Sequence, residues 1–377
     1  MDADVIVVGG GPGGAMAGRA LAQRGVRVLV LEKATFPRHK PCGGSLSPKV
    51  LSTGVDFTEV VEGVVTEAVF TAPGQTPVQY QAYKPLAYMV QRERFDQLLL
   101  NQAQEIGVRV LHGHRVIHAH EDSRGVEVVT DRAIFRAPVL VGADGAQGAV
   151  ARSFGRSPSR VALAMDARIS PPDRVREAWK GKVLIDFGAI PFGYAWIFPK
   201  THELSTGVLG VKNKVRRLPG HLTQFLKQQG RLNGPRKVTG WPIPLPAWSL
   251  NPVVNDRVLL VGDAAGLVDP FTGEGIYFAM RSGLIAATAI AEGGASVANR
   301  YRQLIRDAFQ QDFRSAAILA GIVHRAPGWS FQALRRHSRG IDAFAAVLTG
   351  ESSYAAFLRK VVRGCLYHGF RKLAPAV

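Results

Sequence analysis

A glycine-rich turn that joins a buried strand to a helix constrains the fold of this chain more than any other feature. The apolar run at residues 5–8 predicts a buried parallel strand, and glycines follow it at once with the spacing GxGxxG. We expect Gly9 to form the tight turn, Gly11 to let backbone amides approach a pyrophosphate, and Gly14 to let a helix at 15–24 pack closely on the strand. The spacing therefore predicts the first βαβ unit of a dinucleotide-binding sheet.

The second strand of this unit ends in an acid. The apolar run at 26–31 is followed by Glu32, about 20 residues beyond the glycines, where a carboxylate can accept both ribose hydroxyls. Strand, helix, strand and terminal acid together predict a functional dinucleotide site.

Two later segments favour FAD over NAD(P) as the dinucleotide. The apolar runs at 139–141 and 258–261 each end in a Gly/Asp turn, which places Asp144 and Asp263 beside the nucleotide crevice. Asp263 is suited to bind the ribityl hydroxyls. The amides at 273–276 open another predicted helix, and a helix N-terminus can stabilise negative charge on a reduced flavin ring.

The chain is long enough for two interleaved domains. Its 377 residues exceed one ordinary domain, and its hydrophobic content of 46% supports sizeable cores. We expect an FAD-binding domain at 1–160 and 250–295, with strands at about 60–90 joining the sheet of a substrate domain at 161–249. A helical region is expected at 296–377.

One predicted strand of the substrate domain carries an aromatic face. Alternation along this strand places Tyr194, Trp196 and Phe198 on the same side. Such a face is more often ordinary core than a binding surface. The residues alone leave both interpretations open.

Three segments carry a resemblance to a known family. Residues 36–44, which contain Pro41-Cys42-Gly43-Gly44, resemble the cysteine motif of the geranylgeranyl reductase family, within the FAD-dependent hydroxylase superfamily. Residues 191–199 are similar to the PxxYxWxFP motif of that family, and residues 90–96 resemble the arginine-bearing helix start of the superfamily. The resemblance implies an α/β fold in which a Rossmann-like FAD-binding domain is interleaved with an antiparallel substrate β-sheet, as in p-hydroxybenzoate hydroxylase, with C-terminal helices added.

The resemblance also implies a reaction. Members of the family saturate double bonds of polyprenyl chains on archaeal lipids, chlorophyll precursors or menaquinone, and nothing in the sequence discriminates among these substrates. An isolated alkene has no carbonyl to accept electrons, so a proton must arrive before or with the hydride, and aromatic faces stabilise the resulting positive charge. The candidate catalytic residues are Cys42, Tyr194, Trp196 and Phe198. Cys42 and Tyr194 are candidates for the proton donor or for positioning the alkene, while a relay through water, or a packing role for the Cys42 thiol, stays open.

The motifs and the resemblance together imply the contacts to FAD, with Arg92 as the flavin contact at the helix start. The expected contact residues are Gly9, Gly11, Pro12, Gly13, Gly14, Glu32, Lys33, Arg38, Cys42, Gly43, Gly44, Arg92, Val116, Asp144, Gly145, Gly262, Asp263, Pro270, Gly273, Gly275 and Ile276.

The electron donor is left open between NADPH and ferredoxin, with a quinol as a further alternative. A second GxGxxG does not follow any other predicted strand, so NADPH would bind transiently over the flavin. A basic surface would suit an acidic ferredoxin. No metal site is expected, because His112, His114, His118 and His120 alternate without cysteine or carboxylate partners and are interpreted as surface residues.

The net charge of +18 calls for a partner. Residues 300–377 hold 13 Lys/Arg against 4 Asp/Glu, a net charge of +9 from 13 minus 4. A helix predicted at 354–373 would set Phe357 and other apolar side chains opposite Arg359 and Lys360, and such a helix can lie on an anionic membrane. Alternatively its apolar face packs on the protein itself. Nucleic acid is not an expected partner, because the basic residues are not joined to a recognition motif.

The expected location is cytoplasmic, peripheral to the membrane face. The first strand begins directly after Asp4 with no secretory signal ahead of it, and the longest uncharged apolar runs, such as 315–323, are too short to span a bilayer. Cys42 and Cys365 do not form a disulfide framework, which favours a reducing compartment.

Three rival interpretations stay open. A flavin-dependent monooxygenase or halogenase shares the FAD domain and needs molecular oxygen. A flavoprotein that passes electrons to quinone is a second enzyme class, although its best-known form has an iron–sulfur cysteine cluster that this sequence lacks. A prenyl-lipid carrier similar to Rab escort proteins would need no flavin, and the intact glycine turn, Glu32 and Asp263 argue against it.

Overall fold

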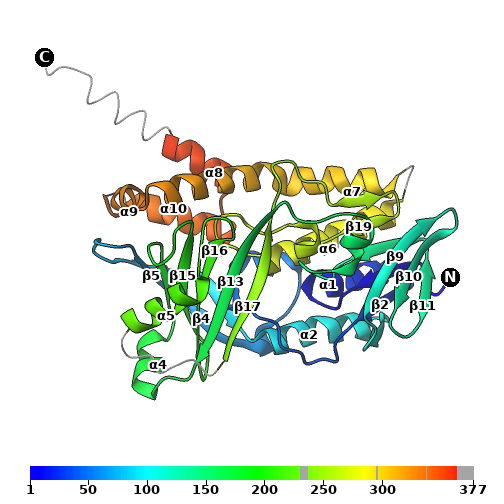
Figure 1. The fold of residues 1–377 in the computed structure, drawn as a ribbon, viewed down its shortest axis with the longest axis horizontal. Helices are drawn as coiled ribbons and strands as arrows, with labels where there is room; N and C mark the ends of the chain where they lie inside the picture. The colour runs from blue at the N-terminus through cyan, green and yellow to red at the C-terminus, as the bar shows by residue number, and fades with distance from the viewer. Residues whose placement is uncertain (230–236, 294–295, 337, 363–377) are drawn as a thin grey trace, which may run out of the picture.

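The protein folds around two large β-sheets at opposite ends of an elongated molecule. The computed structural model describes residues 1–229, 237–293, 296–336 and 338–362. One sheet lies near the N-terminus, the second lies at the other end, and helices run along both (Figure 1). The expected α/β class, with an FAD-type sheet, a second sheet and C-terminal helices, is confirmed.

The first sheet has six strands in the order β18-β19-β12-β1-β2-β8. Their bounds are β1 Val5–Val8, β2 Val28–Glu32, β8 Arg109–His112, β12 Val139–Gly142, β18 Val253–Asn255 and β19 Val258–Leu260. β1 pairs parallel with β2 and β12, and every residue of β1 is buried. Burial on both faces explains why continuous apolar runs predicted these strands. The carboxyl ends of the parallel strands meet at one edge, where α/β sheets bind nucleotides.

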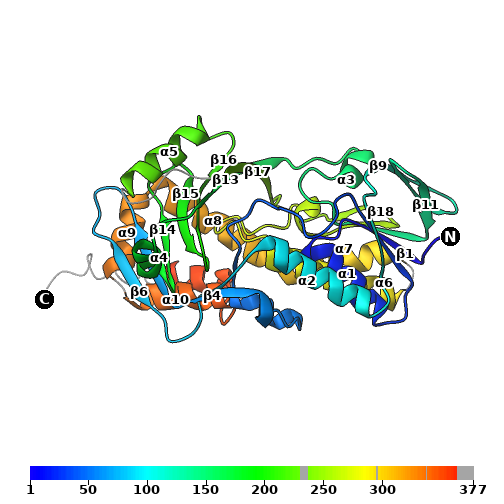
Figure 2. The same ribbon diagram turned by 90° about the horizontal axis from the view of Figure 1, so that it is seen from below.

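Helices pack on this sheet through close glycine contacts. Their bounds are α1 Pro12–Ala22, α2 Arg92–Glu105 and α6 Ile276–Glu292, and Figure 2 shows them stacked beside the sheet. α1 begins at Pro12, earlier than expected, because proline suits the first helical position. A Cβ on Gly14 would overlap the carbonyl oxygen of Gly9, and a Cβ on Gly283 would overlap that of Gly13. The expected role of Gly14 in close helix–strand packing is confirmed.

The second sheet has seven strands in the order β17-β13-β16-β15-β14-β5-β6. Their bounds are β5 Glu67–Thr71, β6 Val78–Gln81, β13 Arg160–Ile169, β14 Lys182–Asp186, β15 Gly193–Pro199, β16 Leu204–Val211 and β17 Lys237–Leu245. Neighbours are antiparallel except β5 and β14, so the expected antiparallel sheet contains one parallel pair. Helix α5 Leu218–Gln228 covers one face, where Leu222 and Phe225 pack against Ala195 and Ile197.

The strands expected at about 60–90 do not all join the seven-stranded sheet. β4 Val61–Val65 pairs with β7 Ala87–Val90, which also pairs with β3 Ser45–Leu46, whereas β5 joins the seven-stranded sheet. The break falls at Thr66, because the amides of Thr66 and Glu67 donate to the carbonyl of Gly181 and so begin the pairing with β14. A separate three-stranded sheet contains β9 Val116–Asp122, β10 Gly125–Thr130 and β11 Ile134–Ala137.

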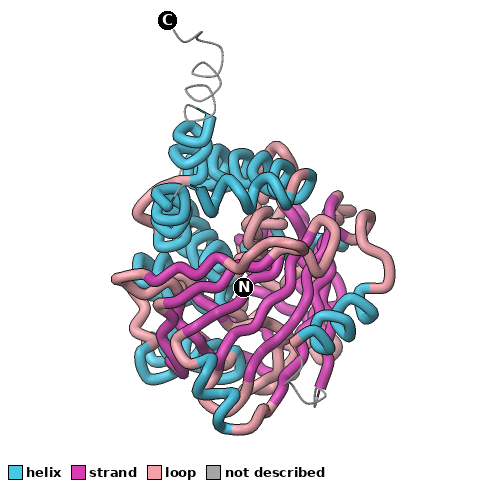
Figure 3. Tube along the Cα trace, turned by 90° about the vertical axis from the view of Figure 1, so that its left-hand side faces the viewer, coloured by secondary structure: helices cyan, strands magenta, loops and turns pink. Residues whose placement is uncertain are grey.

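The C-terminal helices lie along one side of the strands (Figures 1 and 3). Their bounds are α7 Val297–Ile305, α8 Gln311–Arg325, α9 Pro327–Arg336 and α10 Ser338–Thr349, and the shorter helices α3 Ala149–Ser153 and α4 Asp173–Trp179 lie elsewhere. Residues 354–362 are also helical, and Tyr354 and Phe357 are buried against Phe271. The first half of the helix expected at 354–373 therefore packs partly on the protein itself, and its remainder lies outside the described residues. Within the described ranges, no helix is both long and apolar enough to cross a membrane.

Candidate functional site

A cavity of about 730 Å³ extends from the carboxyl ends of β1, β2 and β12 to the face of the seven-stranded sheet that α5 leaves uncovered. Almost all of the residues expected at the site line it. These are Cys42, Tyr194, Trp196 and Phe198 together with Gly9, Gly11, Pro12, Gly13, Glu32, Lys33, Arg38, Gly43, Gly44, Arg92, Val116, Asp144, Gly145, Gly262, Asp263, Gly273, Gly275 and Ile276.

Two expected contact residues lie away from the cavity wall. Gly14 packs beneath the carbonyl of Gly9, as described above. Pro270 belongs to a turn in which the buried carboxylate of Asp269 accepts hydrogen bonds from the amides of Phe271 and Thr272. Both residues shape the backbone of the site from behind it.

The glycine turn forms a rigid cradle at one end of the cavity. Gly9 has a φ of +102°, and a Cβ there would come within 2.5 Å of the carbonyl oxygen of Ala143. Glu32 fixes the turn, because its carboxylate accepts from the amide of Gly10 at 2.7 Å and from that of Ala34 at 2.9 Å. Glu32 keeps further lone pairs for a ligand, and it lines the cavity as expected.

Positive charge lies over this cradle. Arg38 and Arg92 both pair with Asp96, which is fully buried, with Arg38 Nη2 at 3.1 Å from Oδ2 and Arg92 Nε at 2.8 Å from Oδ1. The Arg38 guanidinium lies 3.4 Å from the position of a Cβ on Gly11, and its buried Nη1 has no hydrogen-bond partner among the described residues. Two guanidinium groups share one carboxylate, so a positive charge is left for an anionic ligand at the glycines.

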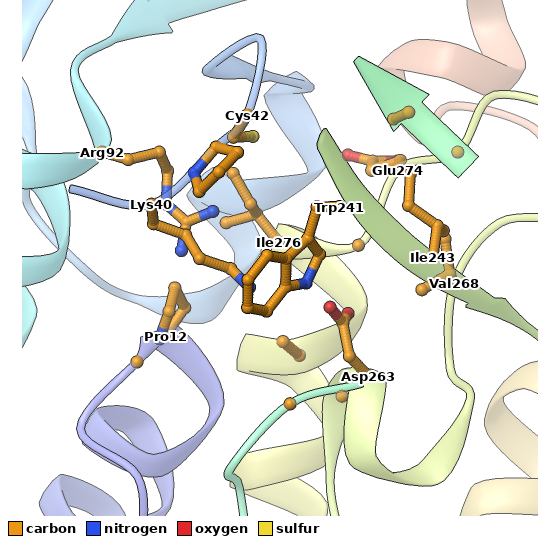
Figure 4. A pocket seen from close by; sticks show the side chains of 18 of the residues that line it. Pro12, Lys40, Cys42, Arg92, Trp241, Ile243, Asp263, Val268, Glu274 and Ile276 are labelled. Atoms are coloured by element: carbon orange, nitrogen blue, oxygen red, sulfur yellow. The ribbon is translucent and has the colours of Figure 1, made fainter. Parts of the chain in front are cut away.

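Two aspartates line the same end of the cavity. Asp144 Oδ2 accepts from the amide of Val150 at 2.9 Å, while its buried Oδ1 has no partner within the described ranges. Burial raises the pKa of Asp144. Asp263 lies beside the loop at Gly275, where α6 begins (Figure 4). The glycine cradle, the unpaired Arg38 nitrogen and these carboxylates fit a dinucleotide with a pyrophosphate and hydroxyl-bearing chains, as FAD has.

The loop that carries Cys42 packs tightly against the aromatic strand β15. Cys42 Sγ accepts from the amide of Gly44 at 3.3 Å, and a Cβ on Gly43 would come within 2.7 Å of the Phe198 ring. Gly44 has a φ of +64°, and a Cβ there would overlap the carbonyl oxygen of Val90. Only glycine fits at these two positions, so Gly43 and Gly44 fix how closely the loop, and with it the Cys42 thiol, approaches the cavity.

Lys200 holds the Cys42 loop in place, although no motif in the sequence indicates this role. The buried ammonium donates to the carbonyls of Gly44 at 2.9 Å and Val90 at 2.7 Å. Burial lowers the pKa of Lys200 to about 8. Its position directly after Pro199, at the end of the aromatic motif, was the available signal.

Tyr194, Trp196 and Phe198 form a continuous aromatic wall of the cavity. Neighbouring ring centroids are 6.0 Å apart in both pairs, and Ala195 and Ile197 face α5 on the other side, as alternation predicted. The Tyr194 hydroxyl donates to the carbonyl of Thr272, and burial raises its pKa above the ordinary range. Tyr194 is therefore a weak acid in this setting.

Strand β17 contributes another wall that the sequence did not reveal. Trp241 lines the cavity, and the ammonium of Lys40 lies 3.7 Å from the centre of its ring (Figure 4). Burial lowers the pKa of Lys40 to about 8. This cation–π contact joins β17 to the Cys42 loop across the cavity.

The histidines differ in part from the expectation. His118 and His120 are exposed, but His112 and His114 are half-buried, and His114 lines the cavity. The reason is that β8 is an edge strand of the six-stranded sheet whose end abuts the cavity. In the described part of the chain, no cluster of three or more histidine, cysteine or acidic residues is placed to bind a metal ion.

The chain matches an FAD-binding family and several individual proteins in sequence. A family described as "FAD binding domain" matches residues 2–185. An uncharacterized protein of Methanosarcina barkeri is 33% identical over 290 residues, which cover 76% of this chain and 74% of that protein. The chloroplastic geranylgeranyl diphosphate reductase of Oryza sativa is 31% identical over 312 residues, covering 78% of this chain and 67% of the relative.

Solved structures show the same fold. A geranylgeranyl bacteriochlorophyll reductase-like protein from Thermoplasma acidophilum has a TM-score of 0.78 at 22% identity and covers 96% of this chain and 95% of its own. The flavin-dependent brominase Bmp2 has a TM-score of 0.74 at 20% identity and covers 97% of this chain and 99% of its own. At these identities the likeness establishes the fold and not the reaction.

A further relative shows which family the chain belongs to. The digeranylgeranylglycerophospholipid reductase of Methanocaldococcus jannaschii is 30% identical over 301 residues, which cover 75% of each chain. Together with the FAD-type cradle, the Cys42 loop and the aromatic wall, this relationship shows that the chain belongs to the geranylgeranyl reductase family of FAD-dependent oxidoreductases.

Proposed function

We propose that this protein saturates isolated carbon–carbon double bonds of a geranylgeranyl or other polyprenyl chain, carried on a lipid, a chlorophyll precursor or a quinone. The observation that supports this most is the continuity of the cavity from the glycine cradle into an apolar chamber. Beyond Cys42 and the aromatic wall, the lining is almost wholly hydrocarbon, with Val65, Phe70, Leu86, Ile185, Phe271 and Phe344. Such a chamber suits a flexible prenyl chain and excludes water.

The wall suits the charge that develops when an unactivated alkene is reduced. Bound FAD in its reduced form would supply a hydride. Protonation at the less substituted alkene carbon gives tertiary cation character, and the faces of Trp196 and Phe198 stabilise positive charge without attacking it. The dry lining keeps water from trapping the cation.

The motif residues have distinct expected roles in this reaction. Cys42 positions or protonates the alkene from a loop that Lys200 fixes. Tyr194 orients the chain as part of the wall, because its hydroxyl is already engaged with Thr272. Arg38 and Arg92 hold the anionic part of FAD.

Electron supply and membrane contact are further parts of the proposal. NADPH or a ferredoxin would reduce the flavin, and the net charge of +18 favours an acidic protein partner. Peripheral binding to an anionic membrane on the cytoplasmic side is supported by Ile318 and Ile322, which are exposed on α8 next to exposed Arg325. Sedimentation with phosphatidylglycerol vesicles but not with phosphatidylcholine vesicles is the expected result.

A flavin-dependent monooxygenase or halogenase is the second candidate, because the brominase shares the fold. A prenyl-lipid carrier is the non-enzymatic alternative. The cavity chemistry favours the reductase, since it pairs a cofactor cradle with a hydrocarbon chamber.

Mass spectrometry of prenyl substrates tests the proposal. Chemically reduced protein is incubated anaerobically with geranylgeranyl diphosphate, a geranylgeranylated glycerolipid or menaquinone. The proposal predicts stepwise gain of hydrogen pairs on at least one chain. Substrate-dependent oxygen consumption with no such gain would instead indicate the monooxygenase class, and a colourless protein that binds prenyl lipid would indicate a carrier.

A further inference from the structure

The cavity wall contains a buried carboxyl group that the motifs do not explain. Asp166 lies on β13 directly opposite Gly207 of β16, and Gly207 lies opposite Trp196 of β15. Directly opposed residues point to the same face of a sheet, so Asp166 faces the cavity in one row with Trp196. Asp166 is 4% exposed and lines the cavity.

The absence of a side chain at Gly207 lets the indole and the carboxyl approach each other. A Cβ on Gly207 would overlap the six-membered ring of Trp196, so the indole leans over this position toward β13. The residue of β13 directly opposite Gly207 is Asp166. The row of residues that contains Trp196 of the aromatic wall therefore continues across the sheet to the carboxyl of Asp166.

A hydrogen-bond chain joins the two residues. Trp196 Nε1 donates to Ser205 Oγ at 3.3 Å, and the Ser205 hydroxyl donates to Asp166 Oδ1 at 2.5 Å. The second oxygen of Asp166, Oδ2, is buried and has no hydrogen-bond partner among the described residues. An unpartnered carboxyl oxygen in a dry wall is the position for a proton.

The surroundings keep that proton on Asp166 at higher pH than usual. Burial raises the pKa of Asp166 to about 6, against the lowering effects of Ser205, Arg168 and Lys200, while Glu203 raises it further. Glu93 on α2 pairs with Arg168 at 2.9 Å and so weakens the pull of Arg168 on Asp166. An apolar chain that displaces water from the cavity would raise this pKa again.

We propose that Asp166 is the catalytic acid that delivers the proton to the alkene, with Ser205 as the positioning residue that ties it to the aromatic wall. This inference rests on the proposed function. In the step, the Asp166 O–H bond breaks as a C–H bond forms at the less substituted alkene carbon, and the π bond is lost. Bound reduced FAD would supply the hydride for the second C–H bond together with both electrons, which balances the two-electron reduction of the alkene. Asp166 is left as a carboxylate and regains its proton from water when the product leaves.

Asp166 suits this role better than the motif residues. The Tyr194 hydroxyl already donates its hydrogen bond to the carbonyl of Thr272, and it is a weak acid. A thiol is ordinarily a much weaker acid than a carboxyl, and Cys42 Sγ accepts the amide of Gly44. A buried carboxyl is the strongest acid available on this wall.

Asp166→Asn provides the main test. The asparagine amide oxygen can still accept from Ser205, so the wall and Trp196 keep their positions while the transferable proton is lost. Asp186→Asn is the matched control, because Asp186 is another sheet aspartate with a hydroxyl partner, Thr71, and it lies outside the cavity lining. Asp166→Glu restores an acid at the same position.

The measurement is the anaerobic single-turnover rate of flavin reoxidation by prenyl substrate, with the product mass determined in the same samples. Retained flavin absorbance and an unchanged wavelength of tryptophan emission show that each variant is folded and loaded. We expect Asp166→Asn to lose on the order of 100-fold in this rate, Asp186→Asn to match the wild type, and Asp166→Glu to recover part of the loss.

Titration of the resting protein gives a readout that does not depend on turnover. The infrared carboxyl band that is present in the wild type and missing in Asp166→Asn should titrate near the pKa of about 6. Ser205→Ala removes an interaction that lowers this pKa, so both the band and the alkaline fall in rate should move to higher pH.

The possible results distinguish the role of Asp166 from the proposed function itself. Wild-type rates in Asp166→Asn, with alkene reduction intact in the wild type, would overturn the inference and leave the proposed function standing. Failure of the wild-type protein to reduce any prenyl chain would overturn both. If Asp166→Asn does not fold, the Ser205→Ala shift in the rate profile decides: an unshifted profile would overturn the role of Asp166.

Discussion

Removing the carboxyl of Asp166 should remove a pH-dependent loss of stability while it impairs catalysis. The pKa of Asp166 rises from an ordinary 3.8 to about 6 because the group is buried. Between these two values the folded state binds more protons than the unfolded state, so stability falls as pH rises through this window and is constant above it. A shift of about two pKa units at about 1.4 kcal/mol each gives a loss of about 3 kcal/mol.

Asp166→Asn lacks this loss, so its stability relative to the wild type should increase by about 3 kcal/mol between about pH 4 and pH 7. The assay is urea unfolding of both proteins at saturating FAD across this range, because any offset from the amide itself does not vary with pH. Asp4→Asn is a control of opposite sign: hydrogen bonding to Arg27 lowers the pKa of Asp4, so the wild-type advantage there is lost as pH falls. A stability difference between Asp166→Asn and the wild type that does not change across this range would show that folding does not raise the pKa of Asp166.

Three further substitutions test the Cys42 loop and the wall. Gly44→Ala should destabilise the protein by about 3 kcal/mol or more, because the new Cβ overlaps the Val90 carbonyl oxygen. The control is Gly54→Ala, which should cost about 1 kcal/mol, because Gly54 is also left-handed at φ +71° but has open space around it. Equal losses of unfolding free energy in urea would contradict the close contact of Gly44 with Val90. Trp196→Ala should spare FAD binding and lower the reduction rate, and unchanged turnover would remove the aromatic wall from the mechanism. Cys42→Ser should keep the yellow colour, and full activity in that variant would leave the thiol a packing role only.

Much of the FAD-binding half was predictable because its determinants are local. The spacing of Gly9, Gly11 and Gly14 and the position of Glu32 specify a strand, a turn, a helix and a second strand within one short segment. The structure places the cradle at the carboxyl ends of β1 and β2 accordingly. Alternation along β15 likewise predicted which side of the strand is aromatic.

What the sequence could not predict depends on pairing between distant segments. Asp166 and Trp196 share a face only because β13, β15 and β16 align in one register, which no local pattern specifies. Apart from its place at the end of the aromatic motif, nothing in the sequence around Lys200 distinguishes it from a surface lysine. It is buried because the Cys42 loop folds back onto β15. The one available signal for Asp166 was its place as the single charged residue in the otherwise apolar segment 162–167.

Transfer of hydrogen from this flavoprotein to an unactivated prenyl alkene can be followed in a single anaerobic reaction. Fully reduced protein is mixed with a geranylgeranyl substrate in the absence of oxygen, and flavin oxidation and product mass are followed together. We expect one oxidised flavin for each pair of hydrogens gained by the substrate. Flavin that stays reduced until oxygen is admitted, with an oxygenated or halogenated product or none at all, would contradict this expectation.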